Sequence, residues 1–211
     1  MENLQLQSIL VEGLEQLEIA SSPQQITGLI NFTHLLLKWN KVYNLTAVRE
    51  VDHIARLHLL DSLSLHPYVA GSARLIDVGS GGGLPGIPLA LLNPHIRFVL
   101  LDSNVKKTRF IKQAAIELNL KNVDVEHSRV ESYKPTQQFD CLISRAFSTI
   151  ANTLPLVEHL LADHAKLIFM KSNTAEQELN DVRSAFKKEI IELHVPGIDA
   201  PRKLAILCKL N

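Results

Sequence analysis

The stretch DVGSGGGL, from Asp77 to Leu84, carries the clearest chemical pattern in the chain. Gly79, Gly81 and Gly83 fall at alternate positions, directly after an apolar run that ends near Asp77. Glycine tolerates positive φ angles and lets a ligand approach the backbone, whereas a Cβ at such a site costs about 1 kcal/mol. The pattern therefore predicts a loop that binds a small molecule through its backbone.

Two common phosphate-binding loops fit this stretch less well. The chain has no G-K-[ST] sequence, which excludes a P-loop. Gly81, Gly83 and Gly86 satisfy the dinucleotide pattern G-x-G-x-x-G, but the first of them lies four residues beyond Asp77 instead of directly after the strand. Two prolines in LPGIP also withhold backbone N–H donors that a pyrophosphate would use. A nicotinamide dinucleotide stays a rival ligand at this point.

The elements around this loop fall into two patterns. Residues 1–70 are predicted to be helical: a first helix over 2–18, a second that opens at the cap Ser22-Pro23-Gln24-Gln25, and a third from Asp52 that stops before Pro67. In residues 71–211, short apolar runs alternate with helical patterns, which is typical of βαβ units. The expected strands are RLIDV, RFVLLD, NVDVEH, FDCLIS and KLIFMK, with helices near 85–92, 104–119, 149–162 and 174–188 and a closing antiparallel hairpin of EIIELHV and LAILCKL.

This order of elements predicts an α/β fold. We expect a doubly wound sheet with a C-terminal antiparallel hairpin, preceded by a helical N-terminal extension. Read from Asp77, the pattern D-x-G-x-G-x-G resembles motif I of the class I S-adenosylmethionine-dependent methyltransferases, whose sheet is Rossmann-like. Asp102 ends the next strand, 25 residues after Asp77, where a carboxylate can accept hydrogen bonds from both ribose hydroxyls. Its alternative role is to cap the helix that follows.

Several further stretches give a more specific resemblance. DVGSGGGLPGIPLA, LLDSNVKKTRF, SRVE, SRAF and KWNKVYNLT are similar to motifs of the bacterial small-subunit rRNA guanine-N7 methyltransferases, the glucose-inhibited division protein B family. The resemblance runs from about Asn31 to the final hairpin. It implies transfer of a methyl group from S-adenosyl-L-methionine to N7 of one guanine in the decoding-region loop of 16S rRNA in the small ribosomal subunit.

The resemblance also implies site residues. Gly79 and Leu84 lie against the methyl donor, Val130 and Glu131 flank its adenine, and Arg145 lies between donor and target. Asp102 takes the ribose position of the class I pattern. The cofactor set expected is Asp77, Gly79, Gly81, Gly83, Leu84, Asp102, Val130, Glu131 and Arg145. MKS replaces the expected MKG after Lys171, which puts only the local turn in doubt.

The chemistry of N7 methylation agrees with the residues at the fourth strand. SRAF stands where methyltransferases of exocyclic amines carry an Asn/Asp-Pro-Pro-aromatic motif, and Cys141 lies inside the strand and is expected in the core. Guanine N7 has an in-plane lone pair and no proton to lose, so neither a general base nor a covalent intermediate is needed. Arg145 is expected as the catalytic residue that orients a phosphate or the guanine edge, and its alternative role is an ion pair with Asp140.

A basic segment with aromatic residues predicts the RNA-contacting surface. Basic and aromatic side chains together suit looped RNA, where bases stack and phosphates are neutralised. The alternatives are core packing for Trp39 and a solvated face for a second basic patch, Lys106, Lys107, Arg109 and Lys112. The RNA-binding residues expected are Lys38, Trp39, Asn40, Lys41, Asn44, Arg56, His58 and Lys171.

Composition sets the remaining expectations. The 211 residues balance 22 basic against 22 acidic side chains, so any nucleic-acid surface must be a local patch. Cys141 and Cys208 are expected to be reduced and buried, and the histidine and cysteine spacings predict no metal site. Without a signal peptide or a membrane-length apolar run, we expect a cytoplasmic monomer. A small-molecule methyltransferase and a non-enzymatic RNA-binding module with a structural nucleotide remain alternatives.

Overall fold

A twisted sheet of seven strands forms the centre of the computed structural model, which describes residues 2–145, 147–182 and 185–209. Its strand order is β3-β2-β1-β4-β5-β7-β6. β7 runs antiparallel to β5 and β6, and the other neighbouring pairs are parallel. The strands are β1 (Arg74–Val78), β2 (Arg97–Asp102), β3 (Val123–His127), β4 (Phe139–Arg145), β5 (Leu161–Lys171), β6 (Phe186–Leu193) and β7 (Arg202–Lys209).

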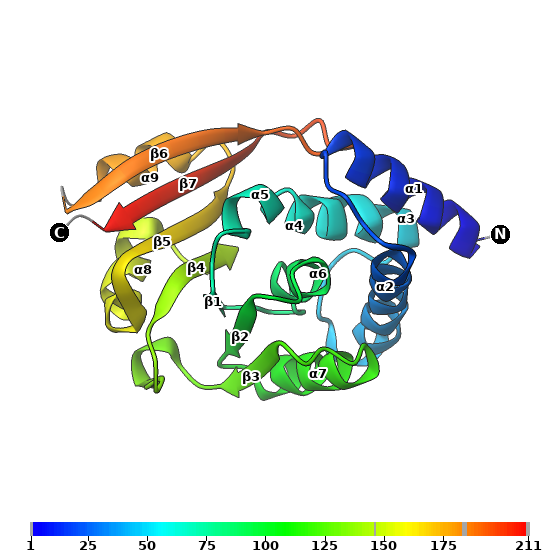
Figure 1. Cartoon of the computed structure of the whole chain (residues 1–211), viewed down its shortest axis with the longest axis horizontal. Helices are drawn as coiled ribbons and strands as arrows, with labels where there is room; N and C mark the ends of the chain where they lie inside the picture. Colours follow the sequence, from blue (N-terminus) through cyan, green and yellow to red (C-terminus); the bar gives the residue numbers. More distant parts are fainter. Residues whose placement is uncertain (1, 146, 183–184, 210–211) are drawn as a thin grey trace.

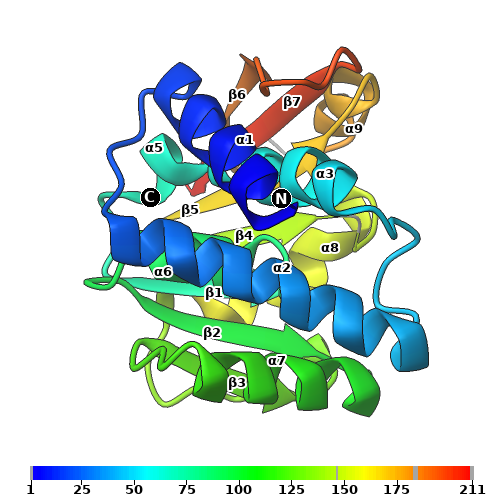
Figure 2. The same ribbon diagram turned by 90° about the vertical axis from the view of Figure 1, so that its right-hand side faces the viewer.

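Helices cover both faces of this sheet (Figure 1). Helices α1 to α7 lie on one face, and Figure 2 shows α1 and α2 crossing in front of the strands. The other face carries α8 and α9. The helices are α1 (Glu2–Gln16), α2 (Pro23–Tyr43), α3 (Val51–Ile54), the π-helix η1 (Ala55–Leu60), α4 (Asp61–Leu63), α5 (His66–Val69), α6 (Gly86–Leu92), α7 (Val105–Glu117), α8 (Ile150–Val157) and α9 (Ala175–Asn180), with 3-10 turns η2 (Val130–Ser132) and η3 (Glu158–Leu160).

Alternate residues of the central strands enter two separate cores. In β1, Leu75 packs into the core under α1 to α7, whereas Ile76 and Val78 pack into the core under α8 and α9. Because both faces are buried, these parallel strands consist of continuous apolar runs. The N-terminal helices share the first core with the sheet, since Leu10, Leu36 and other side chains of residues 2–69 are part of it.

Several predicted elements are confirmed. β1 and β2 match RLIDV and RFVLLD residue for residue, and β6 and β7 form the expected antiparallel hairpin. α2 opens with the predicted capping box, in which the Ser22 hydroxyl accepts from the Gln25 N–H and the Gln25 side chain accepts from the Ser22 N–H. Among the described residues, no helix has the length and apolarity needed to cross a membrane.

Two predicted helices were too long. The helix expected over 174–188 ends at Asn180, and β6 begins at Phe186. Leu179, Val182 and Phe186 have the spacing of a helix face and all three pack at the second core, but Phe186 does so from a strand. Antiparallel pairing with β7 along residues 186–193 decides for the strand. Likewise, the helix expected over 149–162 yields to β5 at Leu161, where that strand begins to pair with β4.

The helix expected from Asp52 and stopping before Pro67 is present as a continuous run of α3, η1 and α4, from Val51 to Leu63. The π-helical turn η1 within it was not expected, and Pro67 lies in the first turn of a further short helix, α5. Proline is tolerated there because the first helical N–H groups have no partner within the helix.

Candidate functional site

The glycine-rich loop after β1 adopts the backbone that its sequence predicts. Gly79, Gly81 and Gly83 have φ angles of 73°, 56° and 77°, a region that favours glycine. The N–H of Gly79 donates to the carbonyl of Leu101, and the N–H of Gly81 donates to the Asp102 carboxylate at 2.9 Å. The loop is thus fixed to the carboxyl end of β2.

A cavity of about 260 Å³ lies at the carboxyl ends of β1 and β2. Ligands of open α/β sheets bind at this edge. A Cβ built on Gly79 would lie 2.8 Å from the Phe147 ring, so the missing side chain leaves room at the cavity wall. The cavity is lined by Val78, Gly79, Leu101, Asp102, Ser103, Lys107, Ser128, Arg129, Val130, Glu131 and Phe147.

Asp102 faces this cavity and organises its floor. One carboxylate oxygen accepts from the Gly81 N–H, and the other accepts from the Asn104 N–H at 2.8 Å. The helix-cap alternative for Asp102 is wrong, because the Asn104 side chain caps α7 by accepting from Lys106 and Lys107. Each oxygen of Asp102 keeps a further lone pair, which a ligand hydroxyl can use.

Other residues of the predicted cofactor set lie behind the cavity wall. Leu84 is packed in the first core, and Gly81 and Gly83 do not line the cavity. Asp77 is fully buried, and its Oδ2 accepts from the Gly86 N–H at 2.9 Å, while Oδ1 has no hydrogen-bond partner among the described residues. Burial raises the pKa of Asp77 to about 7, against opposing effects of the Gly86 N–H and the Arg145 guanidinium.

A second, open cleft of about 580 Å³ lies beside the ends of β4, β5 and β7. Arg145, the last residue of β4, lines this cleft, whereas Phe147 lines the first cavity. Ala146 of the SRAF motif lies outside the described residues. The cleft is lined by Val48, Leu57, His58, Asp61, Arg145, Met170, Lys171, Ser172, Thr174, Glu178 and Arg202.

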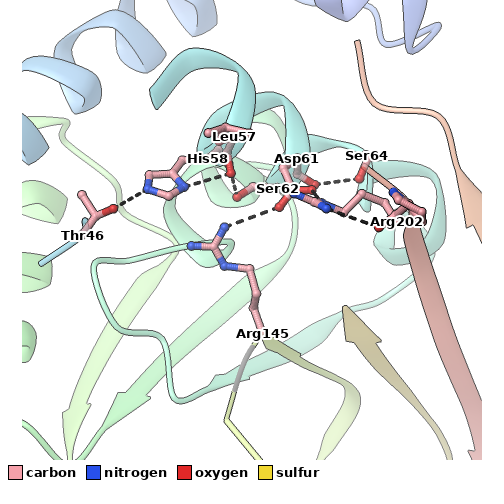
Figure 3. Close-up of polar contacts among 9 residues, drawn as sticks. Thr46, Leu57, His58, Asp61, Ser62, Ser64, Arg145 and Arg202 are labelled. Carbon is pink, nitrogen blue, oxygen red and sulfur yellow. Dashed lines mark hydrogen bonds and ion pairs between the residues drawn. The ribbon is translucent and has the colours of Figure 1, made fainter. Parts of the chain in front are cut away.

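Arg145 meets a different carboxylate from the one expected. Its Nη1 lies 3.5 Å from Oδ2 of Asp61, while Asp140 accepts from the backbone N–H groups of Ala73 and Arg74. Asp61 also accepts at Oδ1 from Nε of Arg202, at 2.9 Å (Figure 3). Burial lowers the pKa of Arg145, and Asp61 and Asp77 oppose this shift. The alternative role of Arg145, an ion pair within the protein, is thus present with Asp61 in place of Asp140, and Asp61 and Arg202 are site residues that sequence reasoning missed.

His58 and Lys171 also reach the cleft. Nε2 of His58 lies 2.5 Å from the Thr46 hydroxyl, and burial together with the nearby Arg145 lowers the His58 pKa, so the ring is neutral at pH 7. The Lys171 ammonium donates to the Ser148 carbonyl and pairs with Glu178, both at 2.8 Å. The Lys171 charge is therefore already neutralised by a partner inside the protein.

The predicted RNA-contacting residues separate into surface and interior groups. Lys38, Lys41 and Asn44 are exposed, near the end of α2. Trp39 packs against the first core, stacked on Tyr43 at a centroid distance of 5.3 Å, which agrees with the core-packing alternative.

Asn40 and Arg56 are also engaged within the protein. Asn40 is buried, accepts from the Thr46 N–H and donates to the Val48 carbonyl, so its side chain shapes the loop after α2. Arg56 is half-buried, and its side chain lies against Gly197.

The remaining side chains with reactive or ligand chemistry were also located. In the second basic patch, Lys107 lines the first cavity, whereas Lys106, Arg109 and Lys112 are exposed. Cys141 is buried as expected, and Cys208 is half-buried. In the described part of the chain, no three His, Cys, Asp or Glu residues come together in a way that could hold a metal ion.

Solved structures with low sequence identity share this fold. N-methyltransferase NodS from Bradyrhizobium japonicum WM9, solved with S-adenosyl-L-homocysteine, superposes with a TM-score of 0.57 at 14% identity, over 85% of this chain and 99% of that one. A putative O-methyltransferase from Klebsiella pneumoniae gives a TM-score of 0.62 at 10% identity, over the whole of both chains. The predicted class I S-adenosylmethionine-dependent methyltransferase fold is thereby confirmed.

Sequence comparison identifies the family. The model of the family described as rRNA small subunit methyltransferase G matches residues 25–205. A ribosomal RNA small subunit methyltransferase G from Chromobacterium violaceum is 45% identical over 196 residues, which cover 92% of this chain and 94% of the relative. One from Hydrogenovibrio crunogenus is 48% identical over 187 residues, covering 88% and 86%. The chain belongs to the rRNA small subunit methyltransferase G family.

Proposed function

We propose that the protein transfers the methyl group of S-adenosylmethionine to N7 of one guanine in the decoding-region loop of 16S rRNA. The observation that carries this proposal is the family match over residues 25–205. The geometry supports it, because a cavity suited to a nucleoside lies next to an open cleft, with Arg145 on the side of the cleft. The family match also favours the methyl donor over the nicotinamide dinucleotide that the glycine pattern left open.

The residues around the first cavity fit the methyl donor. The Asp102 carboxylate can accept from ribose hydroxyls, and Val130 and Glu131 would hold the adenine. Gly79 lines the cavity without a side chain and would leave its backbone open to the amino-acid part of the ligand, whereas a Cβ there would displace Phe147, another lining residue. When bound, S-adenosylmethionine supplies an electrophilic methyl group on sulfur.

The chain's own residues need only orient the guanine. N7 carries its lone pair in the ring plane and requires no deprotonation, so no residue of the cleft has to act as a general base. Burial raises the pKa of Cys141 to about 12, so this thiol is not a nucleophile. Arg145 would donate to a phosphate or to O6 and leave N7 free, and alignment of N7 with the methyl group supplies the rate enhancement.

The surface residues of the helical extension would meet the surrounding RNA. Lys38, Lys41 and Asn44 are exposed, and the loop that follows them brings Val48 to the cleft. Lysines at such positions neutralise phosphates and make binding depend on salt. The proposal requires one protein molecule and no metal, and it places the protein in the cytoplasm with the ribosomal subunits.

The test uses small subunits from a strain that lacks the enzyme. After incubation with the protein and labelled S-adenosylmethionine, N7-methylguanine is mapped by borohydride reduction and aniline cleavage of the 16S rRNA. We expect one new cleavage site in the decoding region. Label without a new cleavage site would place the methyl group on another atom, and the absence of label would refute the proposal.

A further inference from the structure

A single carboxylate joins the helical extension to two arginines of the sheet. Asp61, the first residue of α4, lies between Arg145 at the end of β4 and Arg202 at the start of β7 (Figure 3). Oδ2 is 3.5 Å from Nη1 of Arg145, and Oδ1 accepts from Nε of Arg202 at 2.9 Å. The Asp61 side chain is 6% exposed, against 24% and 25% for the two arginines. The carboxylate is therefore covered, while both guanidinium groups reach the cleft.

The helix geometry before Asp61 places this carboxylate. The π-helix η1 spans Ala55–Leu60, and the Asp61 N–H donates to the carbonyl of Arg56, five residues earlier. π-helical turns are rare and often occur at functional sites. The turn is further fixed because the Ser62 hydroxyl donates to the His58 carbonyl and the Ser64 hydroxyl donates to the Asp61 carbonyl. Figure 3 shows His58 and Asp61 on the side of the helical segment that faces Arg145.

The basic side chains of the cleft outnumber the acidic partners that they contact. Lys171 is balanced by Glu178, whereas Arg145 and Arg202 share the one carboxylate of Asp61. This cluster of three residues keeps one net positive charge, which favours a polyanion in the cleft. Asp61 itself repels that polyanion, so its presence beside the arginines is explained by the orientation it gives them.

We propose that Asp61 is a positioning residue for methyl transfer. It holds the guanidinium groups of Arg145 and Arg202 in the arrangement in which they meet the target nucleotide, and it does so without touching the RNA. This inference rests on the proposed function, because orientation of Arg145 matters only if a nucleotide is presented to the donor. Loss of a positioning residue lowers turnover and leaves RNA affinity intact, whereas loss of an ordinary stabilising ion pair lowers stability and RNA affinity together.

Asp61→Asn separates the two roles. The substitution keeps the size of the side chain and raises the charge of the cleft by one. We expect turnover of small subunits to fall about 10- to 100-fold, since a displacement of 1 Å at a reacting group has an effect of this size. The KM for subunits should stay equal or decrease, with a salt dependence of binding at least as steep, because a negative charge has been removed from the RNA-binding cleft.

The measurements distinguish the proposal from a structural role. Steady-state kinetics with undermethylated subunits give kcat and KM, and calorimetry gives the affinity for S-adenosylhomocysteine, which should not change. Asp61→Glu keeps the charge and should retain more turnover than Asp61→Asn. The matched control is Asp52→Asn, a carboxylate of α3 that contacts Gln5 and does not line the cleft. This control should behave as the wild type.

Two results would overturn the inference. The first is wild-type kcat in Asp61→Asn, and the second is a joint loss of thermal stability, donor affinity and RNA affinity, which marks a structural role. If Asp61→Asn does not fold, NMR of the Arg145 guanidinium compares Asp61→Glu with the wild type. The Arg145 signals are assigned by their loss in Arg145→Lys. Restricted rotation of the guanidinium in the wild type and in Asp61→Glu supports the inference, and free rotation in the wild type refutes it. Absence of methyl transfer by the wild type rejects the proposed function and this inference with it, whereas wild-type kcat in Asp61→Asn rejects the inference alone.

Discussion

Alanine substitutions at three glycines separate backbone strain from steric collision in the cofactor loop. Gly79 has a φ of 73°, and a Cβ there would lie 2.8 Å from Cδ2 and 3.4 Å from Cβ of Phe147. Gly81 has a φ of 56°, but its Cβ would meet only the Gly79 carbonyl oxygen, at 3.8 Å. Gly71, in the turn before β1, has nothing within 4 Å of the added carbon and no positive φ.

The structure sets the expected magnitudes. A Cβ at positive φ costs about 1 kcal/mol, so Gly79→Ala and Gly81→Ala should each lower Tm by roughly 2–4 °C for a chain of this size. Gly79→Ala must also displace Phe147, which lines the cavity, and we expect the Kd for S-adenosylhomocysteine to rise about tenfold or more, equivalent to about 1.4 kcal/mol. Gly71→Ala should match the wild type in both measurements.

Differential scanning fluorimetry and isothermal titration calorimetry on the three variants provide the test. Gly81→Ala should lose stability yet bind the ligand more tightly than Gly79→Ala does. Equal ligand affinities for Gly79→Ala and Gly71→Ala would refute the assignment of the first cavity to the methyl donor. Equal losses for Gly79→Ala and Gly81→Ala would show that strain alone, without the contact to Phe147, governs the loop.

Three further predictions concern the charged residues. Arg145→Ala should abolish methyl transfer and yet retain S-adenosylhomocysteine binding better than Gly79→Asp does, as measured by calorimetry; equal transfer by Arg145→Ala and the wild type would contradict the role of Arg145. The pKa of Asp77 is raised from 3.8 to about 7, so the folded protein binds this proton more tightly than the unfolded chain, and stability falls as pH rises from about 4 to 7. Asp77→Asn should therefore gain stability over the wild type above pH 7 and lose this advantage near pH 4, which urea denaturation of the ligand-free proteins at both pH values would show. Lys38→Ala combined with Lys41→Ala should raise the KM for subunits and reduce the salt dependence of binding while kcat stays unchanged, whereas unaltered binding would favour a small-molecule substrate.

The centre of the sheet could be predicted from the sequence because β1 and β2 are buried on both faces. RLIDV and RFVLLD are continuous apolar runs with a charged residue at their ends, and β1 and β2 follow them residue for residue. The end of the chain was harder, because Leu179, Val182 and Phe186 have the spacing of a helix face although Phe186 already belongs to β6. Only the pairing of β6 with β7, a tertiary contact, distinguishes the strand from a helix.

The candidate site was predicted where backbone chemistry determines it. Positive φ angles at the glycines of the loop follow from residue type, and the role of Asp102 follows from its place as the last residue of a strand. Asp61 was missed because its partners Arg145 and Arg202 are distant in the sequence, the second by 141 residues. One signal was available: the aspartate interrupts the apolar run HLLDSL, and a charged residue on a buried helical segment requires a partner.

The segment KWNKVYNLT supports the site mainly by core packing and by hydrogen bonds that hold the loop after α2. Trp39 packs into the core, and Asn40 holds the backbone at Thr46 and Val48. Thr46 in turn contacts His58, which lies one helical turn before Asp61, the partner of Arg145. Because each contact in this series is made by a side chain held in place by the preceding one, the helical extension forms a wall of the target cleft in addition to a basic surface. This segment, one of the stretches that resemble the family's motifs, therefore fixes the geometry of the cleft that Arg145 lines.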